Sequence, residues 1–288
     1  MRRSPGLCLA GLMCLSVVAC GSSVEAGRTT ASTHSATFQN GEVRLAYTLD
    51  VPPGAGPFPA IVAGHGSGRT RRQDLARFAA EWTRRGFAVL RFDKRGVGES
   101  TGTYVFVGTD DSPRVFPELA SDIVAAARFL RTRSEIDPRR VGLAGWSQAG
   151  WILPHAARLL GDAAFLVLFS GPVCSVGQEM YYSDLAENTT RPLPEVNALM
   201  PGFHGPAGYD PVPTLRELHT PALWLLGLGD RSIPIETTLT NLKALTAAGK
   251  PFEWRTYDGL DHDLSPRVWE DVEPWVARYA SRPRREQH

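Results

Sequence analysis

The chain has 288 residues, of which 43% are hydrophobic and 21% are charged, as is ordinary for a soluble globular protein. This length fits one large α/β domain or two small ones and leaves enough apolar material for a sizeable core. The net charge of +1 provides no strong electrostatic field, so we expect neither nucleic acid nor an acidic macromolecule as a partner.

The N-terminal residues have the features of an export signal. Arg2 and Arg3 precede an apolar stretch, residues 7–19, that is too short for an ordinary membrane-spanning helix. Cys20 then follows a Val-Val-Ala run and precedes Gly-Ser-Ser, which resembles a bacterial lipobox. We therefore expect residues 1–19 to be a signal peptide and Cys20 to be lipidated. The alternative is a plain secretory signal with an incidental cysteine, and both interpretations predict export to the bacterial cell envelope or beyond.

Residues 20–36 are rich in Ser, Thr, Ala and Gly and are expected to form a flexible tether. A single folded domain is expected to occupy residues 37–288. Its first element is a predicted β-hairpin, because Asn40-Gly41 lies between two stretches in which apolar and polar residues alternate.

From residue 60 onward, short apolar stretches alternate with longer amphipathic ones. The apolar stretches predict strands at 60–63, 87–92, 141–145, 165–169, 223–226 and 252–257. The amphipathic stretches predict helices at 73–85, 117–133, 148–160, 236–248 and 265–279. This alternation predicts an α/β fold in which a mostly parallel central sheet carries helices on both faces.

Residues from about 171 to 213 interrupt this rhythm. The segment contains several prolines and a glycine-rich stretch and is too long for a simple connection. We interpret it as a small, partly helical cap that precedes the strand at 223–226 and covers the site. A disordered surface loop is the alternative interpretation.

The segment from Gly145 to Gly150 reads Gly-Trp-Ser-Gln-Ala-Gly and directly follows a predicted strand. A serine between small residues at a strand-to-helix turn is typical of a nucleophile elbow, whose usual pattern is G-x-S-x-G. Ala149 departs from this pattern but is also small. Ser147 is therefore the predicted nucleophile.

A serine hydroxyl needs a histidine base, and the histidine needs a carboxylate to orient it. After a nucleophile elbow, these partners follow in the chain order acid, then histidine. Asp230 follows the strand at 223–226 in a glycine-rich turn, and His262 follows the last predicted strand. We predict that Ser147, His262 and Asp230 form a catalytic triad. The nearby carboxylates are expected to be solvated: Asp258, Asp261 and Asp263.

An acyl-transfer site also needs backbone N–H donors for the oxyanion that forms on the carbonyl oxygen. The residue after the nucleophile, Gln148, is expected to supply one of them. The glycine-rich loop after the strand at 60–63 is expected to supply the other, through Ser67. The alternative is that Gly66 and Gly68 serve only a tight turn.

Several segments, in this order along the chain, resemble the α/β-hydrolase superfamily: His65-Gly-Ser-Gly68, Arg91-Phe-Asp-Lys-Arg-Gly-Val-Gly-Glu-Ser100, Gly145-Trp-Ser-Gln-Ala149, Gly229-Asp230-Arg-Ser-Ile-Pro234 and Asp261-His262-Asp263. Within the superfamily, the chain resembles bacterial esterases of the dienelactone-hydrolase and serine-aminopeptidase-like groups. The resemblance implies an α/β-hydrolase fold from Ala60 to the C-terminus. It also implies that Asp93 and Arg95 belong to a structural loop near the site.

Taken together, these motifs predict a serine hydrolase, and specifically a carboxylesterase that acts on a small acyl ester without a metal or organic cofactor. An aminopeptidase or amidase is the first alternative, with an amine subsite formed by Glu179, Asp184 and Glu187. A thioesterase and a non-catalytic envelope-binding lipoprotein are the others. The aromatic residues proposed to line an acyl site are Trp146, Tyr181, Tyr182 and Phe203.

Overall fold

The computed structural model describes residues 30–187 and 189–280. The predicted signal peptide, Cys20 and most of the predicted tether lie outside these residues. The strands are β1 (Ser32–Asn40), β2 (Val43–Val51), β3 (Phe58–Gly64), β4 (Ala88–Phe92), β5 (Ile136–Trp146), β6 (Leu166–Phe169), β7 (Ala222–Gly227) and β8 (Phe252–Tyr257). The helices are α1 (Ala76–Arg84), α2 (Ser112–Arg131), α3 (Ala149–Leu160), α4 (Val176–Ala186), α5 (Leu193–Leu199), α6 (Val212–Glu217), α7 (Ile235–Ala247) and α8 (Trp269–Ala280), with 3₁₀ turns η1 (Met200–Gly202) and η2 (Pro266–Val268).

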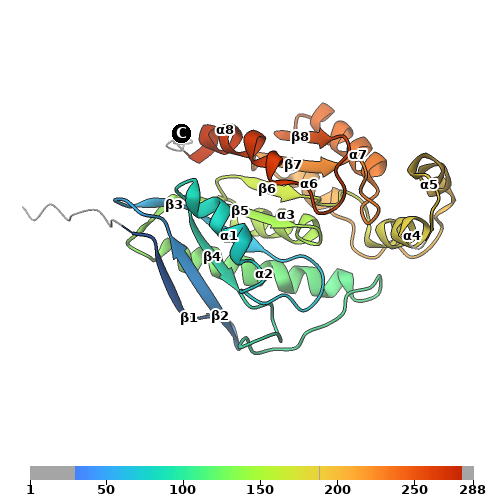
Figure 1. The fold of residues 1–288 in the computed structure, drawn as a ribbon. Helices are drawn as coiled ribbons and strands as arrows, with labels where there is room; N and C mark the ends of the chain where they lie inside the picture. The colour runs from blue at the N-terminus through green and yellow to red at the C-terminus, as the bar shows by residue number, and fades with distance from the viewer. Residues whose placement is uncertain (1–29, 188, 281–288) are drawn as a thin grey trace, which may run out of the picture.

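All the described strands belong to one eight-stranded sheet of order β1-β2-β4-β3-β5-β6-β7-β8. The β1–β2 and β2–β4 pairs are antiparallel, and every other pair is parallel. The hairpin therefore forms one edge of a mostly parallel sheet (Figure 1). This order, with helices on both faces, confirms the expected α/β-hydrolase fold.

The first strand corrects one predicted boundary. The tether was expected to continue to Ala36, but β1 begins at Ser32, which pairs with Val51 of β2. Apart from Thr33, the side chains of residues 32–36 do not favour a strand. These residues form a strand because they pair with β2, whose main chain offers a continuous ladder of hydrogen-bonding groups to residues 32–36.

Helices cover both faces of the sheet because alternate residues of the central strands point in opposite directions. In β7, Trp224 and Leu226 belong to the core cluster that contains residues of α2, α3 and α7, whereas Leu223 and Leu225 belong to the cluster that contains residues of α1 and α8. Such strands read as continuous apolar runs, as expected when both faces are buried. The layers are visible in Figure 1, where α1 and α8 lie on the opposite side of the sheet from α2 and α3.

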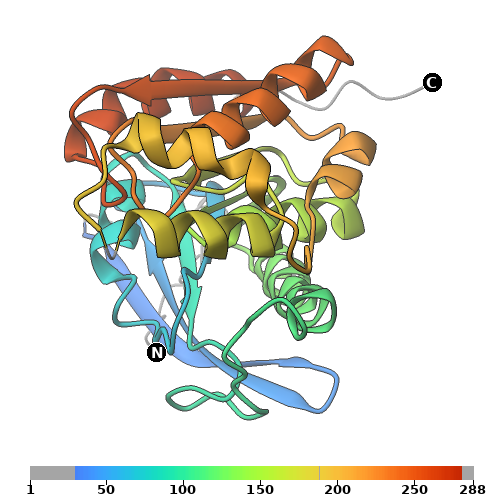
Figure 2. The same cartoon turned by 90° about the vertical axis from the view of Figure 1, so that its right-hand side faces the viewer.

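The segment from about 171 to 213 contains α4, α5 and the turn η1, and α6 begins at its end. Its first helix has a complete cap, because the Ser175 side chain accepts from the Gln178 N–H while the Gln178 side chain accepts from the Ser175 N–H. Tyr182, Ala186 and Val196 form a small apolar cluster between α4 and α5. In Figure 2 the two helices lie across the front of the molecule, and α4 contributes side chains to the cavity described below.

Candidate active site

Ser147 lies in the turn between β5 and α3. Its backbone has φ of +54°, a left-handed conformation that is uncommon for a residue with a side chain, and its N–H donates to the carbonyl of Phe169 at 2.9 Å. Strained backbone of this kind is found at functional sites and is the mark of a nucleophile elbow. The turn presents Ser147 at the wall of a cavity.

The departure from the G-x-S-x-G pattern at Ala149 has a simple packing explanation. A Cβ on Gly145 would lie 2.6 Å from the Cβ of Ala149 and 3.0 Å from the Cα of Gly64, so only glycine fits there. A Cβ on Gly150 would similarly meet Pro172 at 2.6 Å. Gly145 therefore lets β5 approach α3 and β3 closely, Gly150 leaves room for the segment after β6, and the Ala149 methyl group is fully buried beside Gly145.

Asp230 and His262 are joined as the sequence predicts. His262 Nδ1 lies 2.9 Å from Asp230 Oδ2, while Asp230 Oδ1 accepts hydrogen bonds of 2.8 Å from the N–H groups of Ser232 and Ile233. Asp230 is completely buried. A proton on Nδ1 satisfies the carboxylate, so the lone pair of the neutral imidazole is on Nε2, the nitrogen that can accept a proton from a nucleophile.

The loop that carries His262 rests on two features that sequence reasoning did not identify. A Cβ on Gly227 would meet the carbonyl oxygen of Asp261 at 2.4 Å, so the loop lies directly against the glycine-rich turn after β7. Ser170, which follows β6 and is buried with φ of +47°, donates from Oγ to the carbonyl of His262 at 2.7 Å. The sequence gives no sign of the role of Ser170, because its backbone conformation and its contact with His262 are seen only in the structure.

The electrostatic environment raises the pKa of His262. Burial alone would lower it, but the hydrogen bond that His262 donates to Asp230 and the negative charge of Asp230, with smaller contributions from Asp263 and Glu179, outweigh the burial. Asp230 therefore stabilises the imidazolium that forms when His262 accepts a proton.

Both predicted oxyanion donors lie at the same cavity as Ser147. Ser67 and Gln148 line it, and a Cβ on Gly66 would lie 3.9 Å from the Cβ of Ser147, so the loop after β3 is packed against the elbow. Within the described part of the chain, neither the Ser67 N–H nor the Gln148 N–H donates a hydrogen bond. Gln148 is also the N-cap residue of α3, where unpaired N–H groups favour an anion.

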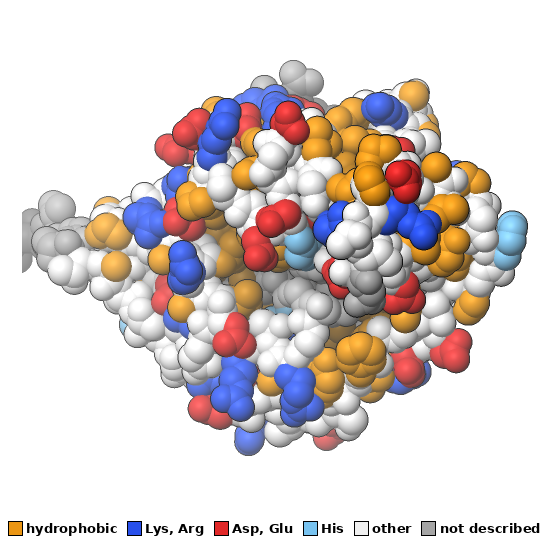
Figure 3. Space-filling model, turned by 45° about the vertical axis from the view of Figure 1, so that its right-hand side comes forward, with side chains coloured by type: hydrophobic (Ala, Val, Ile, Leu, Met, Phe, Trp, Pro, Cys, Tyr) orange, Lys and Arg blue, Asp and Glu red, His pale blue; other side chains and the backbone are white. Residues whose placement is uncertain are grey.

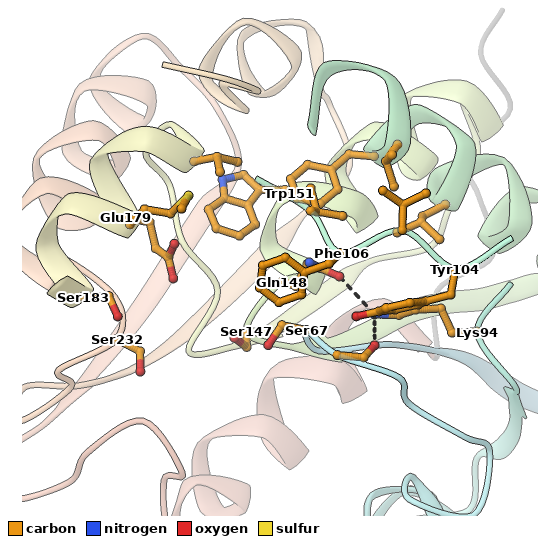
Figure 4. Close-up of a pocket in the computed structure, with 18 of the residues that line it drawn as sticks. Ser67, Lys94, Tyr104, Phe106, Ser147, Gln148, Trp151, Glu179, Ser183 and Ser232 are labelled. Carbon is orange, nitrogen blue, oxygen red and sulfur yellow. Dashed lines mark hydrogen bonds between the residues drawn. The ribbon is translucent and has the colours of Figure 1, made fainter. Parts of the chain in front are cut away.

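The cavity has a volume of about 530 Å³ and is open at the surface as the hollow in Figure 3, where a histidine and acidic side chains lie together at its edge. One part is apolar and comes from the loop before α2 and from helices α2 and α3: Val105, Phe106, Val107, Val115, Phe116, Leu119 and Trp151. The opposite part is polar and comes from α4 and the loop after β7: Glu179, Ser183, Glu187 and Ser232. In Figure 4, Ser147 and Ser67 lie between Glu179 on one side and Tyr104 on the other.

The aromatic residues predicted to line an acyl site do not line this cavity. Trp146 stacks on Phe169, because the residue before the nucleophile points away from it into the core beside α1 and α8. Tyr182 is buried and donates from its hydroxyl to the carbonyl of Asp230 at 2.8 Å. Tyr181 and Phe203 pack against each other in the cap. Phe106, Phe116 and Trp151 take their place.

Of the three acidic residues considered for an amine subsite, Glu179 and Glu187 line the cavity and Asp184 does not. Glu179 shares its face of α4 with Ser183, four residues later, which also lines the cavity, whereas Asp184 is five residues from Glu179 and points in a different direction. Burial raises the pKa of Glu179 to about 7, and the charge of Glu187 contributes.

The Asp93–Arg95 loop has the structural contacts that the resemblance implies. The Asp93 carboxylate accepts from the Arg72 N–H and guanidinium and from the Glu99 N–H. Arg95 pairs with Asp122 of α2 at 2.8 Å. The residue between them, Lys94, was not singled out from the sequence, yet it lines the cavity.

Residues 30–187 and 189–280 contain no group of three or more His, Cys, Asp or Glu side chains that could hold a metal ion. Over the same residues, no helix is both long and apolar enough to cross a bilayer.

The sheet order, the strained serine after β5 and the acid–histidine pair after β7 and β8 place the chain in the α/β-hydrolase class. Residues 71–281 match the model of the prolyl oligopeptidase family, and the chain belongs to that hydrolase family.

The chain is also similar to individual proteins. The chain is 34% identical over 116 residues to the quorum-quenching protein AidA of Acinetobacter baumannii, covering 39% of this chain and 35% of that protein. It is 25% identical over 224 residues to the rat (Rattus norvegicus) acylamino-acid-releasing enzyme, covering 74% and 30%. The matched segments thus span only about a third of these relatives. The structure of the Pyrococcus furiosus esterase PF2001 aligns with a TM-score of 0.66 at 16% identity, covering 87% of this chain and 92% of that one, and shows the shared fold.

Proposed function

We propose that the protein is a serine hydrolase that cleaves small acyl esters through Ser147, His262 and Asp230. The observation that carries the proposal is that Ser147 and His262 line one cavity while His262 is hydrogen-bonded to the buried Asp230. In the described residues no hydrogen bond yet joins Ser147 Oγ to His262, as is common before substrate binds, when catalytic contacts are often long.

The proposed reaction follows from this geometry. His262 Nε2 accepts the Ser147 proton as Oγ attacks the acyl carbonyl, and the N–H groups of Ser67 and Gln148 face the oxyanion that forms. The imidazolium then gives its proton to the leaving group. Water, deprotonated in turn by His262, hydrolyses the acyl-enzyme and releases the acid.

The two parts of the cavity suggest how a substrate binds. The apolar part, which includes Phe116 and Trp151, suits the acyl chain, and the polar part, which includes Glu179 and Ser232, suits a hydrated leaving group. The volume of about 530 Å³ lies in the range of small-molecule sites, so we propose a compact ester rather than a polymer as substrate.

Amide hydrolysis is the second candidate, because the family is named for prolyl oligopeptidase and a matching relative is the acylamino-acid-releasing enzyme. The same triad can cleave either an ester or an amide bond, so a panel of test substrates must contain both esters and amides. It should compare p-nitrophenyl esters of graded acyl length with N-acylaminoacyl and aminoacyl p-nitroanilides. A kcat/KM that is larger for anilides than for esters of the same acyl group would reverse the order of the two candidates.

The nucleophile is tested with Ser147→Ala. We expect kcat for p-nitrophenyl esters to fall by about 10⁴-fold or more, with loss of labelling by a fluorophosphonate probe. Ser183→Ala is the matched control, since Ser183 lines the same cavity on α4 and should leave labelling intact. Undiminished turnover in Ser147→Ala would contradict the proposal, and an unlabelled native protein would favour a non-catalytic binding role.

A further inference from the structure

The ammonium group of Lys94 is buried beside the proposed oxyanion site. The residue is only 3% exposed. Its Nζ donates to the carbonyl of Gly66 at 2.7 Å, to the carbonyl of Gly68 at 3.0 Å and to Oε1 of Gln148 at 3.1 Å. All three donors of a protonated lysine are therefore used. Figure 4 shows Lys94 beside Gln148, with the dashed hydrogen bonds meeting at its Nζ.

These acceptors control the direction of the proposed oxyanion donors. The carbonyl of Gly66 and the N–H of Ser67 belong to one planar trans peptide unit, so they point in opposite directions. A hydrogen bond that holds the Gly66 oxygen therefore fixes where the Ser67 N–H points. The bond to Gln148 ties the same ammonium to the residue that supplies the second donor.

This position is costly for a charge. No carboxylate lies within ion-pair distance of Lys94 among the described residues, and the neighbouring Asp93 carboxylate is occupied by Arg72 and the Glu99 N–H. Burying a lone ammonium is unfavourable unless hydrogen bonds compensate for its lost hydration. The carbonyls of Gly66 and Gly68 and the Gln148 amide oxygen supply these hydrogen bonds. The geometry of the loop after β3 therefore depends on whether Lys94 is protonated.

We propose that Lys94, in its protonated form, is a positioning residue that holds the Ser67 peptide and Gln148 in the geometry needed to bind the oxyanion. This inference rests on the proposed serine hydrolase function. Loss of the proton leaves a neutral amine with fewer donors and removes a positive charge from the edge of the site, so the transition state loses stabilisation while substrate binding is little changed.

The proposal predicts a pH dependence with a definite sign. Burial lowers the pKa of Lys94 to about 8, so the group is protonated at neutral pH and loses its proton as the pH rises through 8. The charged groups around Lys94 do not change over this pH range. His65 is neutral because burial lowers its pKa to about 3, and Arg72 and Arg95 form ion pairs with Asp93 and Asp122 respectively. Across the cavity, burial raises the pKa of Glu179 to about 7, and Asp230 raises the pKa of His262. His262 must be neutral to act as a base, so the loss of its proton raises kcat and does not produce a decline. We therefore expect kcat to decline above about pH 8.

The test compares the native protein with Lys94→Met and Lys94→Arg over pH 6–10, with an ester substrate. In Lys94→Met we expect kcat to fall by about 10- to 100-fold, KM to change less than threefold and the decline near pH 8 to disappear. Lys94→Arg, which keeps the charge at all these pH values, should retain more activity than Lys94→Met and should also lack the decline. Lys243→Met, at an exposed lysine, is the matched control and should keep the native profile.

A wild-type measurement covers the case in which Lys94→Met does not fold. The chain contains only three lysines, Lys94, Lys243 and Lys250, so ¹³Cε-lysine NMR can follow each of them. One signal should titrate near pH 8, together with the decline of kcat. The proposal is overturned if no lysine titrates there, if kcat declines at a different pH, or if a folded Lys94→Met keeps the decline. An inactive, unlabelled native protein would instead refute the proposed hydrolase function itself.

Discussion

At the residue scale, Asp230 holds His262 in one orientation before any substrate binds. Its Oδ1 is fixed by two backbone N–H groups and its Oδ2 by His262 Nδ1. The carboxylate cannot rotate without breaking these bonds, so the tautomer of His262 is set by main-chain geometry at the end of β7. The local sequence explains why, because the Asp-Arg-Ser-Ile turn supplies both N–H groups within three residues of the acid.

Replacing Asp230 with Asn tests this arrangement through both rate and pH dependence. We expect kcat to fall by about 10³- to 10⁴-fold, because the amide no longer fixes the tautomer or stabilises the imidazolium. The pKa of His262 should fall, since Asp230 supplies the main contributions that raise it against burial. A base must be neutral to act, so the rise of kcat/KM with pH should move to lower pH in the variant.

The control for this experiment is Asp258→Asn, which changes an exposed carboxylate in the same loop region and should alter neither kcat nor the pH profile. In the native protein, the rise of kcat/KM with pH reflects Glu179 and His262 together. The pKa of Glu179 is about 7, and its charge also raises the pKa of His262. A profile that stays in place when Asp230 is replaced would show that the carboxylate does not set the pKa of the histidine.

The sequence predicted the residues of the site better than it predicted their surroundings. Ser147, Asp230 and His262 each follow a strand in a fixed chain order, which is a local signal. Lys94 gave no such signal, because a lysine in a loop is normally solvated and only the tertiary contacts with Gly66, Gly68 and Gln148 bury it.

At the element scale, the position of the loop that carries His262 depends on close contact between the turns after β7 and β8. Gly229 N–H donates to the carbonyl of Leu260 at 2.8 Å, and Gly227 leaves no room for a side chain against Asp261. The neighbouring strands β7 and β8 are parallel and in register, so their carboxyl ends bring Asp230 and His262 together. Ser170, after β6, fixes the same loop from the other side.

Gly227→Ala tests this packing. The new Cβ would lie 2.4 Å from the Asp261 carbonyl oxygen, so the His262 loop must move. We expect a loss of stability of about 1–3 kcal/mol, as for other overpacked sites. We also expect a fall in kcat of at least 10-fold, because a small displacement of His262 disrupts its alignment with Ser147. Chemical denaturation and ester kinetics measure the two effects.

Gly202→Ala is the control for steric crowding, because its nearest contact would be the Tyr181 hydroxyl at an ordinary 3.7 Å. That variant should keep native stability and activity. If Gly227→Ala loses stability but keeps kcat, the loop tolerates displacement and the contact serves folding alone.

The elements themselves show where local signals fail. The apolar spacing predicted a helix at 117–133, but α2 begins at Ser112 and contains Pro117. Val115 and Phe116 are buried in the core, and this packing offsets the hydrogen bond that proline cannot donate. The choice of aromatic residues for the cavity failed for a similar reason, because it depends on which way Trp146 and Trp151 point from the elbow.

At the scale of the whole molecule, the cavity is built from distant parts of one domain. The loop before α2, the elbow, the cap helix α4 and the loops after β7 and β8 all contribute, which is why no single stretch of sequence predicts its shape. The cap is the least predictable part, because α4 is placed by long-range contacts such as Tyr182 with Asp230 and Arg231 with the carbonyl of Ala186. Specificity therefore follows from tertiary structure rather than from a motif.

The proposed membrane anchor at Cys20 lies outside the described residues and is tested separately. If Cys20 carries the lipid, Cys20→Ser should move the protein from the membrane fraction to the soluble fraction of a bacterial host, because the acyl chains provide the anchoring free energy at about 0.8 kcal/mol per buried methylene group. Mass spectrometry of the N-terminal peptide should show acyl groups only in the native protein. Cleavage at the same place without acylation would favour the plain secretory signal.

Two controls separate anchoring from folding and catalysis. Cys174→Ala changes a cysteine that is buried in the core and should leave the protein in the membrane fraction. The released Cys20→Ser protein should hydrolyse a water-soluble ester with the native kcat, because none of the residues around Ser147 lies near the N-terminal segment in sequence and all belong to the described domain. Retention of Cys20→Ser in the membrane fraction would refute the lipid anchor, whereas a loss of kcat would show that attachment to the membrane also affects the site.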